Sequence, residues 1–357
     1  MTLGIFILFL MTLVMGTYLA MALVANRPAV RGAATDTERM MIAILIVAAF
    51  VAALIARPTA FGVDTITYFG MYDQFCFARI DDLELSYAVT FSLLNISQAG
   101  ACNSALLTTS WVLLILLCFV LLPETWNTRI KLAALGLFSL IGTELATNAL
   151  RQGLSAGVMM LAVAWYRRNR LLGLALAGFA ILLHVSTGLV LVAVIVAFLR
   201  FRYFVLALGV LVVLVLSYSY LGLNIEALNR LTGEIDKYSA HDADDLYVRI
   251  LAAAQLFVPI GVTVVTQGWA EKQSNNERGD LSIALKIALT ALPYLVLPYF
   301  GYRYIYGIYL LVLYLSRSAI LDDRRPAFEL VLLANSLIAL VWALGSSYLK
   351  QIPFLVL

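Results

Sequence analysis

Residues 149–199 read ALRQGLSAGVMMLAVAWYRRNRLLGLALAGFAILLHVSTGLVLVAVIVAFL. This stretch contains three apolar runs, at 149–166, 171–183 and 186–199, separated by a basic turn and by a short turn at His184. Apolar runs that approach about 20 residues are typical of helices that span a bilayer. The stretch therefore predicts short membrane helices joined by tight turns.

The rest of the chain extends this pattern. Of its 357 residues 63% are hydrophobic and 13% are charged, whereas a soluble domain is about half apolar and about a quarter charged. We therefore predict one all-α domain over residues 1–357, a polytopic transmembrane helical bundle of about 12 spans. The expected spans are 3–25, 40–56, 101–122, 130–146, 149–166, 171–183, 186–199, 203–221, 248–268, 281–297, 304–318 and 327–347.

Basic residues set the expected orientation. Most of the 24 lysines and arginines fall in alternate connections, and such connections usually face the cytoplasm. They are 27–39, 129–131, 167–170, 200–202, 272–286 and 317–325. Both termini are then expected outside, and the first run, which lacks a basic flank before it, is expected to be a retained helix.

Two longer segments are expected on the outer face. Segment 57–100 contains an apolar stretch, 83–96, that is too short to span easily and predicts an interfacial or re-entrant helix. Segment 222–247 is polar and acidic. Cys76 and Cys102 flank the short helix in an oxidising compartment, so we expect a disulfide between them. Cys118 lies within a span and is expected to be free.

Ionisable side chains gather where spans meet this outer face. Such groups cost about 2.5–3.5 kcal/mol each at membrane depth and persist when they are paired or used. We expect a cavity at this face that is lined by Asp64, Glu144, Arg151, His184, Arg249 and Arg303. Arginine donates two parallel hydrogen bonds to phosphate oxygens, and tyrosine suits sugar faces and hydroxyls. The pattern predicts a site for a sugar-linked diphosphate.

The same residues also have structural interpretations. Glu144 and Arg151 form an internal ion pair in one of them, and His184 is then a buried histidine bonded to a neighbour. Arg249 and Arg303 fit interfacial anchors beside aromatic residues. Glycines 153 and 157 form a GxxxG pattern, which favours close helix packing.

In the functional interpretation, His184 is the first candidate for a general base, because its ordinary pKa lies nearest neutrality. Glu144 and Asp64 stay open as alternative catalytic groups, as does a mechanism without a dedicated base. Arg151, Arg249, Arg303, Tyr304, Tyr68 and Gln152 are the expected substrate-binding residues. The chain has neither a Gly-rich phosphate loop nor the cysteine spacing of a metal site, and no metal or cofactor is expected.

The order of these motifs resembles a known family. Gly62-x-Asp64-x-x-x-Tyr68, an acidic residue before a short helix (Glu84), Arg151-Gln152-Gly153 and His184-x-Ser186 follow one another. This order is similar to the EpsG family, the Wzy-type polymerases of bacterial exopolysaccharide and O-antigen. Where that family has Glu-Pro-Gly, this chain has Glu84-Leu85-Ser86, so no functional role is carried over to Glu84.

The resemblance implies a glycosyltransferase of the bacterial inner membrane, whose active face is periplasmic. It would join undecaprenyl-diphosphate-linked oligosaccharide repeats into polysaccharide, with membrane lipid and a chain-length regulator protein as further partners and no nucleic acid. Three alternatives stay open. A flippase for the same lipid-linked sugar would require ionisable groups near mid-membrane. A membrane acyltransferase that modifies polysaccharide would require its histidine near the path of a cytoplasmic acyl donor. A purely structural membrane protein would require neither feature.

Overall fold

The computed structural model describes residues 36–56, 63–77, 84–147, 149–221, 244–267, 275–296, 300–322 and 326–345. Within these ranges it contains fifteen α-helices, two 3-10 helices and no strand, so the predicted all-α class is confirmed there. The expected first span and most of the outer polar loop lie outside the described residues.

The first half of the chain forms α2 (Asp36–Ala56), α3 (Val63–Cys76), α4 (Leu85–Ser97), η1 (Ser104–Leu106), α5 (Leu107–Val120), α6 (Trp126–Leu137), α7 (Leu140–Thr147) and α8 (Leu150–Tyr166). The second half forms α9 (Arg170–Leu183), α10 (Thr187–Ala197), α11 (Phe201–Leu221), α13 (Asp244–Gln267), α14 (Asn275–Leu289), η2 (Leu292–Val296), α15 (Phe300–Leu315), α16 (Arg317–Ile320) and α17 (Ala327–Gly345).

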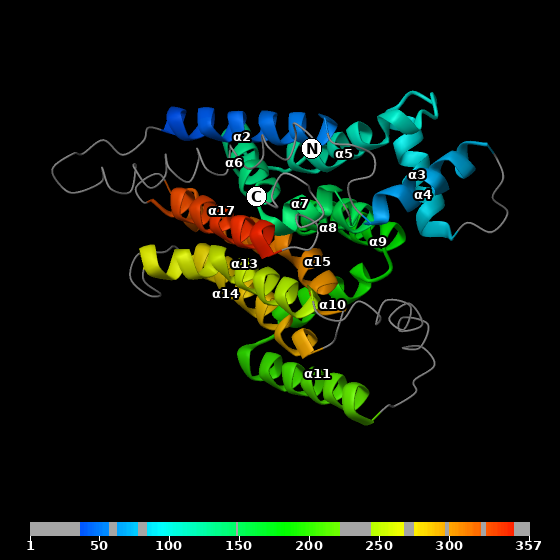
Figure 1. The fold of residues 1–357 in the computed structure, drawn as a ribbon. Helices are drawn as coiled ribbons and strands as arrows, with labels where there is room; N and C mark the ends of the chain where they lie inside the picture. The colour runs from blue at the N-terminus through cyan, green and yellow to red at the C-terminus, as the bar shows by residue number, and fades with distance from the viewer. Residues whose placement is uncertain are drawn as a thin grey trace.

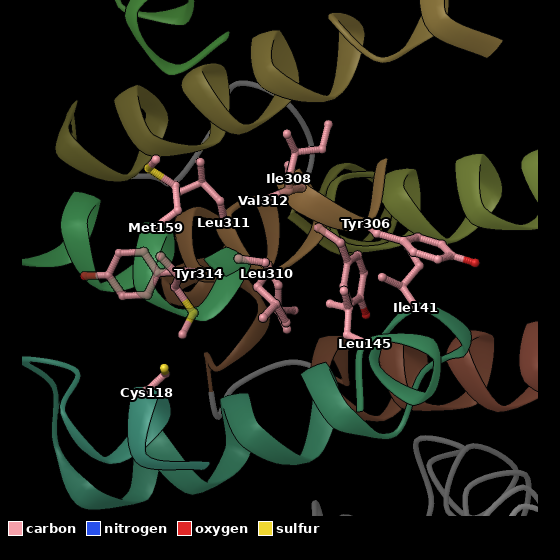
Figure 2. Close-up of a cluster of buried hydrophobic side chains, with 14 of the residues drawn as sticks. Cys118, Ile141, Leu145, Met159, Tyr306, Ile308, Leu310, Leu311, Val312 and Tyr314 are labelled. Atoms are coloured by element: carbon pink, nitrogen blue, oxygen red, sulfur yellow. The ribbon is translucent and has the colours of Figure 1, made fainter. Parts of the chain in front are cut away.

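Helices α8 and α15 occupy the centre of the bundle (Figure 1). Helix α8 packs against α5, α7, α9 and α15, and all of its residues from 152 to 164 are buried. Helix α15 also packs against α13 and α14. Figure 2 shows part of this core, to which α5, α7, α8 and α15 contribute Cys118, Leu145, Met159 and Leu310.

The GxxxG glycines of α8 allow this close packing, as predicted. A Cβ atom on Gly153 would lie 2.4 Å from the Leu145 carbonyl oxygen of α7, and one on Gly157 would lie 2.9 Å from Cys118 Sγ of α5. Both separations are shorter than normal van der Waals contact, so only glycine lets the neighbouring helices approach this far.

Replacing Gly153 by alanine is therefore expected to destabilise the protein by about 1–3 kcal/mol, the usual cost of overpacking a core. The methyl group meets backbone, which cannot rotate away. Gly209→Ala on α11 is the matched control, because its added Cβ meets nothing within 4 Å. Thermal unfolding in detergent measures both variants, and an unchanged midpoint for Gly153→Ala would contradict the packing argument.

The described helices differ in their capacity to cross a membrane. By length and composition one helix, Tyr247–Thr266 within α13, is long and apolar enough, and seven further apolar helices have 10–17 residues. Large apolar side chains on α9, α10 and α11 point outward, among them Leu171, Leu174, Ile195, Phe201 and Leu206. Exposed apolar faces of this kind are suited to contact with lipid chains. The number of about 12 spans remains a prediction.

The expected continuous span at 130–146 is wrong, because the structure divides it into α6 and α7. At the break, Ser139 Oγ donates to the Gly136 carbonyl and accepts from the Gly142 amide, both at 2.8 Å. The Ile141 amide donates to Gln255 Oε1 of α13 at 2.9 Å. Interrupted helices are tolerated in apolar surroundings where neighbouring side chains satisfy the freed backbone groups.

The predicted disulfide between Cys76 and Cys102 is confirmed, with the Cα atoms 5.8 Å apart, and Cys118 is free and buried. The bridge joins the end of α3 to the segment that follows α4. The predicted short helix is present as α4, and the Phe91 ring of this helix packs edge-to-face against Tyr72 and at a tilt against Phe75 of α3. Helices α3 and α4 thus form a crosslinked unit at one side of the bundle (Figure 1).

Candidate functional site

Arg151, in the first turn of α8, is held by the start of α4. Its Nη1 donates to Ser86 Oγ at 2.7 Å and lies 3.8 Å from Glu84 Oε2. Ser86 Oγ in turn donates to Glu84 Oε1 at 2.7 Å. The guanidinium carbon lies 3.4 Å from the centroid of the Tyr87 ring, a cation–π contact. A carboxylate, a hydroxyl and an aromatic face therefore surround this cation.

Aromatic rings continue away from Arg151. Tyr87 lies 6.2 Å from Tyr68 of α3, and Tyr68 lies 6.2 Å from Trp111 of α5, both measured between ring centroids. The structure thus places Tyr68 in the neighbourhood of Arg151. Asp64 lies in the first turn of α3, one turn before Tyr68, and its side chain is outside the described part of the chain.

His184 occupies the turn between α9 and α10, where its Nδ1 lies 2.6 Å from Ser186 Oγ. Burial lowers the pKa of His184, and the positive charges of Arg151 and then Arg303 lower it further. The three side chains come from α8, the α9–α10 turn and α15. In the neutral tautomer whose Nδ1–H donates to Ser186 Oγ, Nε2 is left as an acceptor for a substrate.

Arg303 and Gln152 meet where α15 begins. The Gln152 side-chain amide donates to the Arg303 carbonyl oxygen, which ties α8 to α15. The adjacent Tyr304 is buried, and its hydroxyl lies 2.7 Å from Thr290 Oγ1. Tyr304 therefore stabilises the junction of α14 and α15, and its contact with substrate stays a prediction.

Arg249 and Glu144 lie on two further elements, α13 and α7. Arg249 of α13 donates from Nη1 to the Leu295 carbonyl of η2 at 2.6 Å. Glu144 is partly buried on α7, and its carbonyl accepts from the Ala149 amide at 2.8 Å. Because α7 ends at Thr147 and α8 begins at Leu150, Glu144 and Arg151 lie on separate helices. Catalysis by Glu144 and substrate binding by Arg249 remain predictions.

Three residues that contact Arg151 were not among the predicted site residues. Glu84 carried a signal, since an acidic residue stands at this place in the family pattern, but the departure at Leu85-Ser86 argued against it. Ser86 and Tyr87 carried none, because 65 residues separate Ser86 from Arg151. Among the residues that the structure describes, no group of three or more His, Cys, Asp or Glu side chains could hold a metal.

Fold and site together define an all-α protein with outward apolar faces, in which cationic and aromatic side chains meet at helix ends. The model of the EpsG family matches residues 41–354, and the chain belongs to this family. EpsG family proteins are membrane proteins associated with exopolysaccharide biosynthesis. Neither a curated protein nor a solved structure matches the chain.

Proposed function

We propose that this protein is a polymerase that joins lipid-diphosphate-linked oligosaccharide repeats into polysaccharide on the outer face of the membrane. The observation that carries the proposal is the guanidinium of Arg151, held at the start of α8 by Ser86, Glu84 and Tyr87. Its positive charge and that of Arg303 act on the imidazole of His184. Guanidinium groups can stabilise a departing diphosphate, and a neutral imidazole can accept a proton from a sugar hydroxyl. Family membership in exopolysaccharide biosynthesis supports the same class of reaction.

In the proposed reaction, a hydroxyl oxygen of the acceptor repeat attacks the anomeric carbon of the donor repeat. The bond between that carbon and the diphosphate oxygen breaks, and the electron pair stays with the lipid diphosphate. Arg151 and Arg303 stabilise the charge on this leaving group, while His184 Nε2 takes the hydroxyl proton. The lipid diphosphate is itself the leaving group, so the chemistry requires no nucleotide.

A separate ionic cluster at the other end of α8 supports the proposed orientation. Arg167 donates to Asp280, and Arg317 lies 3.8 Å from the same carboxylate and donates to Glu124 at 2.9 Å. Arg167 and Arg317 both belong to the connections predicted to face the cytoplasm. Since a helix rises 1.5 Å per residue, this cluster lies about 24 Å from Arg151 along α8, which suits opposite membrane faces.

The direct test uses purified protein in detergent with an undecaprenyl-diphosphate-linked repeat from the cells that make it. We expect a ladder of glycans that grows by whole repeats. Repeats that cross the membrane of reconstituted vesicles without lengthening would indicate a flippase, and transfer of an acyl group to the glycan would indicate an acyltransferase.

The coupling of His184 to two cations also predicts a pH dependence. Protonation of His184 as the pH falls removes the base, and its lowered pKa moves this loss to more acidic pH than for an ordinary histidine near 6.5. A bound diphosphate adds negative charge and partly reverses the shift. The acidic limb of kcat, which reports the complex, should therefore lie at higher pH than the acidic limb of kcat/KM. Coincident limbs would contradict this.

Glu84 is expected to compete with the substrate for Arg151. Its carboxylate is 54% exposed and meets the guanidinium at 3.8 Å, so a phosphate group can displace it. Glu84→Gln should bind pyrophosphate up to about 5-fold more tightly, because an exposed pair contributes about 0–1 kcal/mol. Calorimetry with pyrophosphate measures this, and Asp73→Asn, an exposed acid on α3, controls for net charge. Weaker binding by Glu84→Gln would mean that Glu84 supports the site.

A further inference from the structure

Ser155 lies on α8 one turn after Arg151 and is fully buried. Its hydroxyl donates to the Ala180 carbonyl of α9 at 2.8 Å and also forms a hydrogen bond with the Thr187 hydroxyl of α10. Ser155 is therefore bonded to the two helices on either side of the turn that carries His184.

The partners of Ser155 are also the backbone supports of His184. The Ala180 carbonyl accepts the His184 amide at 3.1 Å, and the Thr187 amide donates to the His184 carbonyl at 3.0 Å. Ser186, whose hydroxyl lies 2.6 Å from His184 Nδ1, directly precedes Thr187. A shift of Thr187 therefore moves the hydroxyl that orients the imidazole.

Three other buried hydroxyls, on α4, α13 and α17, behave differently. Thr90 donates to the Ser86 carbonyl, Thr263 to the Pro259 carbonyl and Ser336 to the Leu332 carbonyl, in each case one turn back in the same helix. That arrangement is the usual one for serine and threonine inside helices. Ser155 instead bonds to two other helices, both of them at the turn of His184.

We propose that Ser155 is a positioning residue, which sets the orientation of the His184 imidazole through the Ala180 carbonyl and the Thr187 hydroxyl. The catalytic consequence rests on the proposed role of His184 as the base. Loss of the Ser155 hydroxyl removes its hydrogen bonds to both sides of the α9–α10 turn. The imidazole of His184 can then rotate, and its Nε2 moves away from the hydroxyl of the acceptor sugar. Arg151 and Arg303 keep their places, so kcat should fall while KM for the lipid-linked repeat stays near its wild-type value.

The imidazole itself reports on this arrangement without any substrate. The chain contains two histidines, so a His241→Gln background with ¹⁵N-labelled histidine yields signals from His184 alone. In full-length protein in detergent, we expect Ser155→Ala to shift both ring-nitrogen resonances of His184. Thr187→Val, which replaces the hydroxyl by a methyl of similar size, should do the same, and Thr187→Ser should retain the wild-type resonances. Ser336→Ala is the matched control, because it removes a buried helical hydroxyl whose bond is local.

The same variants are compared in extension of the isolated lipid-linked repeat. We expect kcat to fall at least 10-fold for Ser155→Ala and Thr187→Val, and to stay near the wild-type value for Thr187→Ser. Unchanged His184 resonances in both loss variants would overturn the inference, whatever their activity. Shifted resonances with undiminished kcat would overturn the catalytic part together with the assignment of His184 as base. If Ser155→Ala does not fold, the Thr187→Val and Thr187→Ser pair decides between these outcomes.

Discussion

His184→Ala is expected to abolish chain extension while the lipid-linked repeat still binds. A positioned general base contributes about 10²–10⁴-fold, and a sugar hydroxyl is a weak nucleophile without one. The imidazole is bonded through Nδ1 to Ser186 and is held neutral by its burial and by two arginines. The measurement is the length distribution of glycan made by purified protein, together with binding of the repeat to the same sample.

His184→Gln is the companion variant, because its side-chain amide retains hydrogen bonding and loses the basic nitrogen. It should fold as the wild type does and should fail to extend chains. A His184→Ala protein that polymerises normally would assign the base to a carboxylate. Glu144→Gln and Asp64→Asn are then the next substitutions, since both residues remain candidates from the sequence.

The second large effect is expected at Arg151. Its guanidinium is mostly buried between Tyr87, Ser86 and Glu84, with 12% of the side chain exposed. Removal of one preorganised group that stabilises developing charge costs about 10²–10³-fold in kcat. Arg151→Ala should lose this much, and Arg151→Lys should retain part of the activity, because a lysine keeps the charge but loses the planar fork.

A loss of activity in the Arg151 variants must be distinguished from a loss of folded protein. Glu84 is half exposed, so water can replace its contact with Arg151, and expression of Arg151→Ala should stay near that of the wild type. Arg170→Ala is the matched control, because Arg170 is exposed at the far end of α9. If Arg151→Ala and Arg151→Lys both make glycan of wild-type length, Arg151 has a structural role only.

Local sequence was enough to place several elements of this site. The short α9–α10 turn with His184 followed from two adjacent apolar runs, and α4 followed from one apolar stretch too short to span. The disulfide between Cys76 and Cys102 followed from two cysteines in one outer segment. Each of these features depends on a pattern within a few tens of residues, which hydrophobic periodicity and compartment chemistry specify.

The break between α6 and α7 shows where such patterns fail. Residues 130–146 read as one apolar helix, yet Ile141 donates to Gln255, which lies 114 positions away. Gln255 donates to Asn335 at 3.2 Å, and Asn335 donates to the Leu135 carbonyl at 3.1 Å, near the end of α6. These partners come from α13 and α17, so nothing in the local composition of α6 and α7 could indicate them.

The sequence by itself determined the helical class, the apolar exterior and the residue types available to a site at the helix ends, because burial preferences and helix periodicity are local properties. Only the tertiary structure decided which of those residues meet. It placed Glu84, Ser86 and Tyr87 around Arg151 and let the charge of Arg303 act on His184. It also bonded Ser155 to the helices on either side of the His184 turn. The packing of α4, α8, α9 and α15 sets these distances, and packing depends on the fit of whole helix faces that lie far apart along the chain.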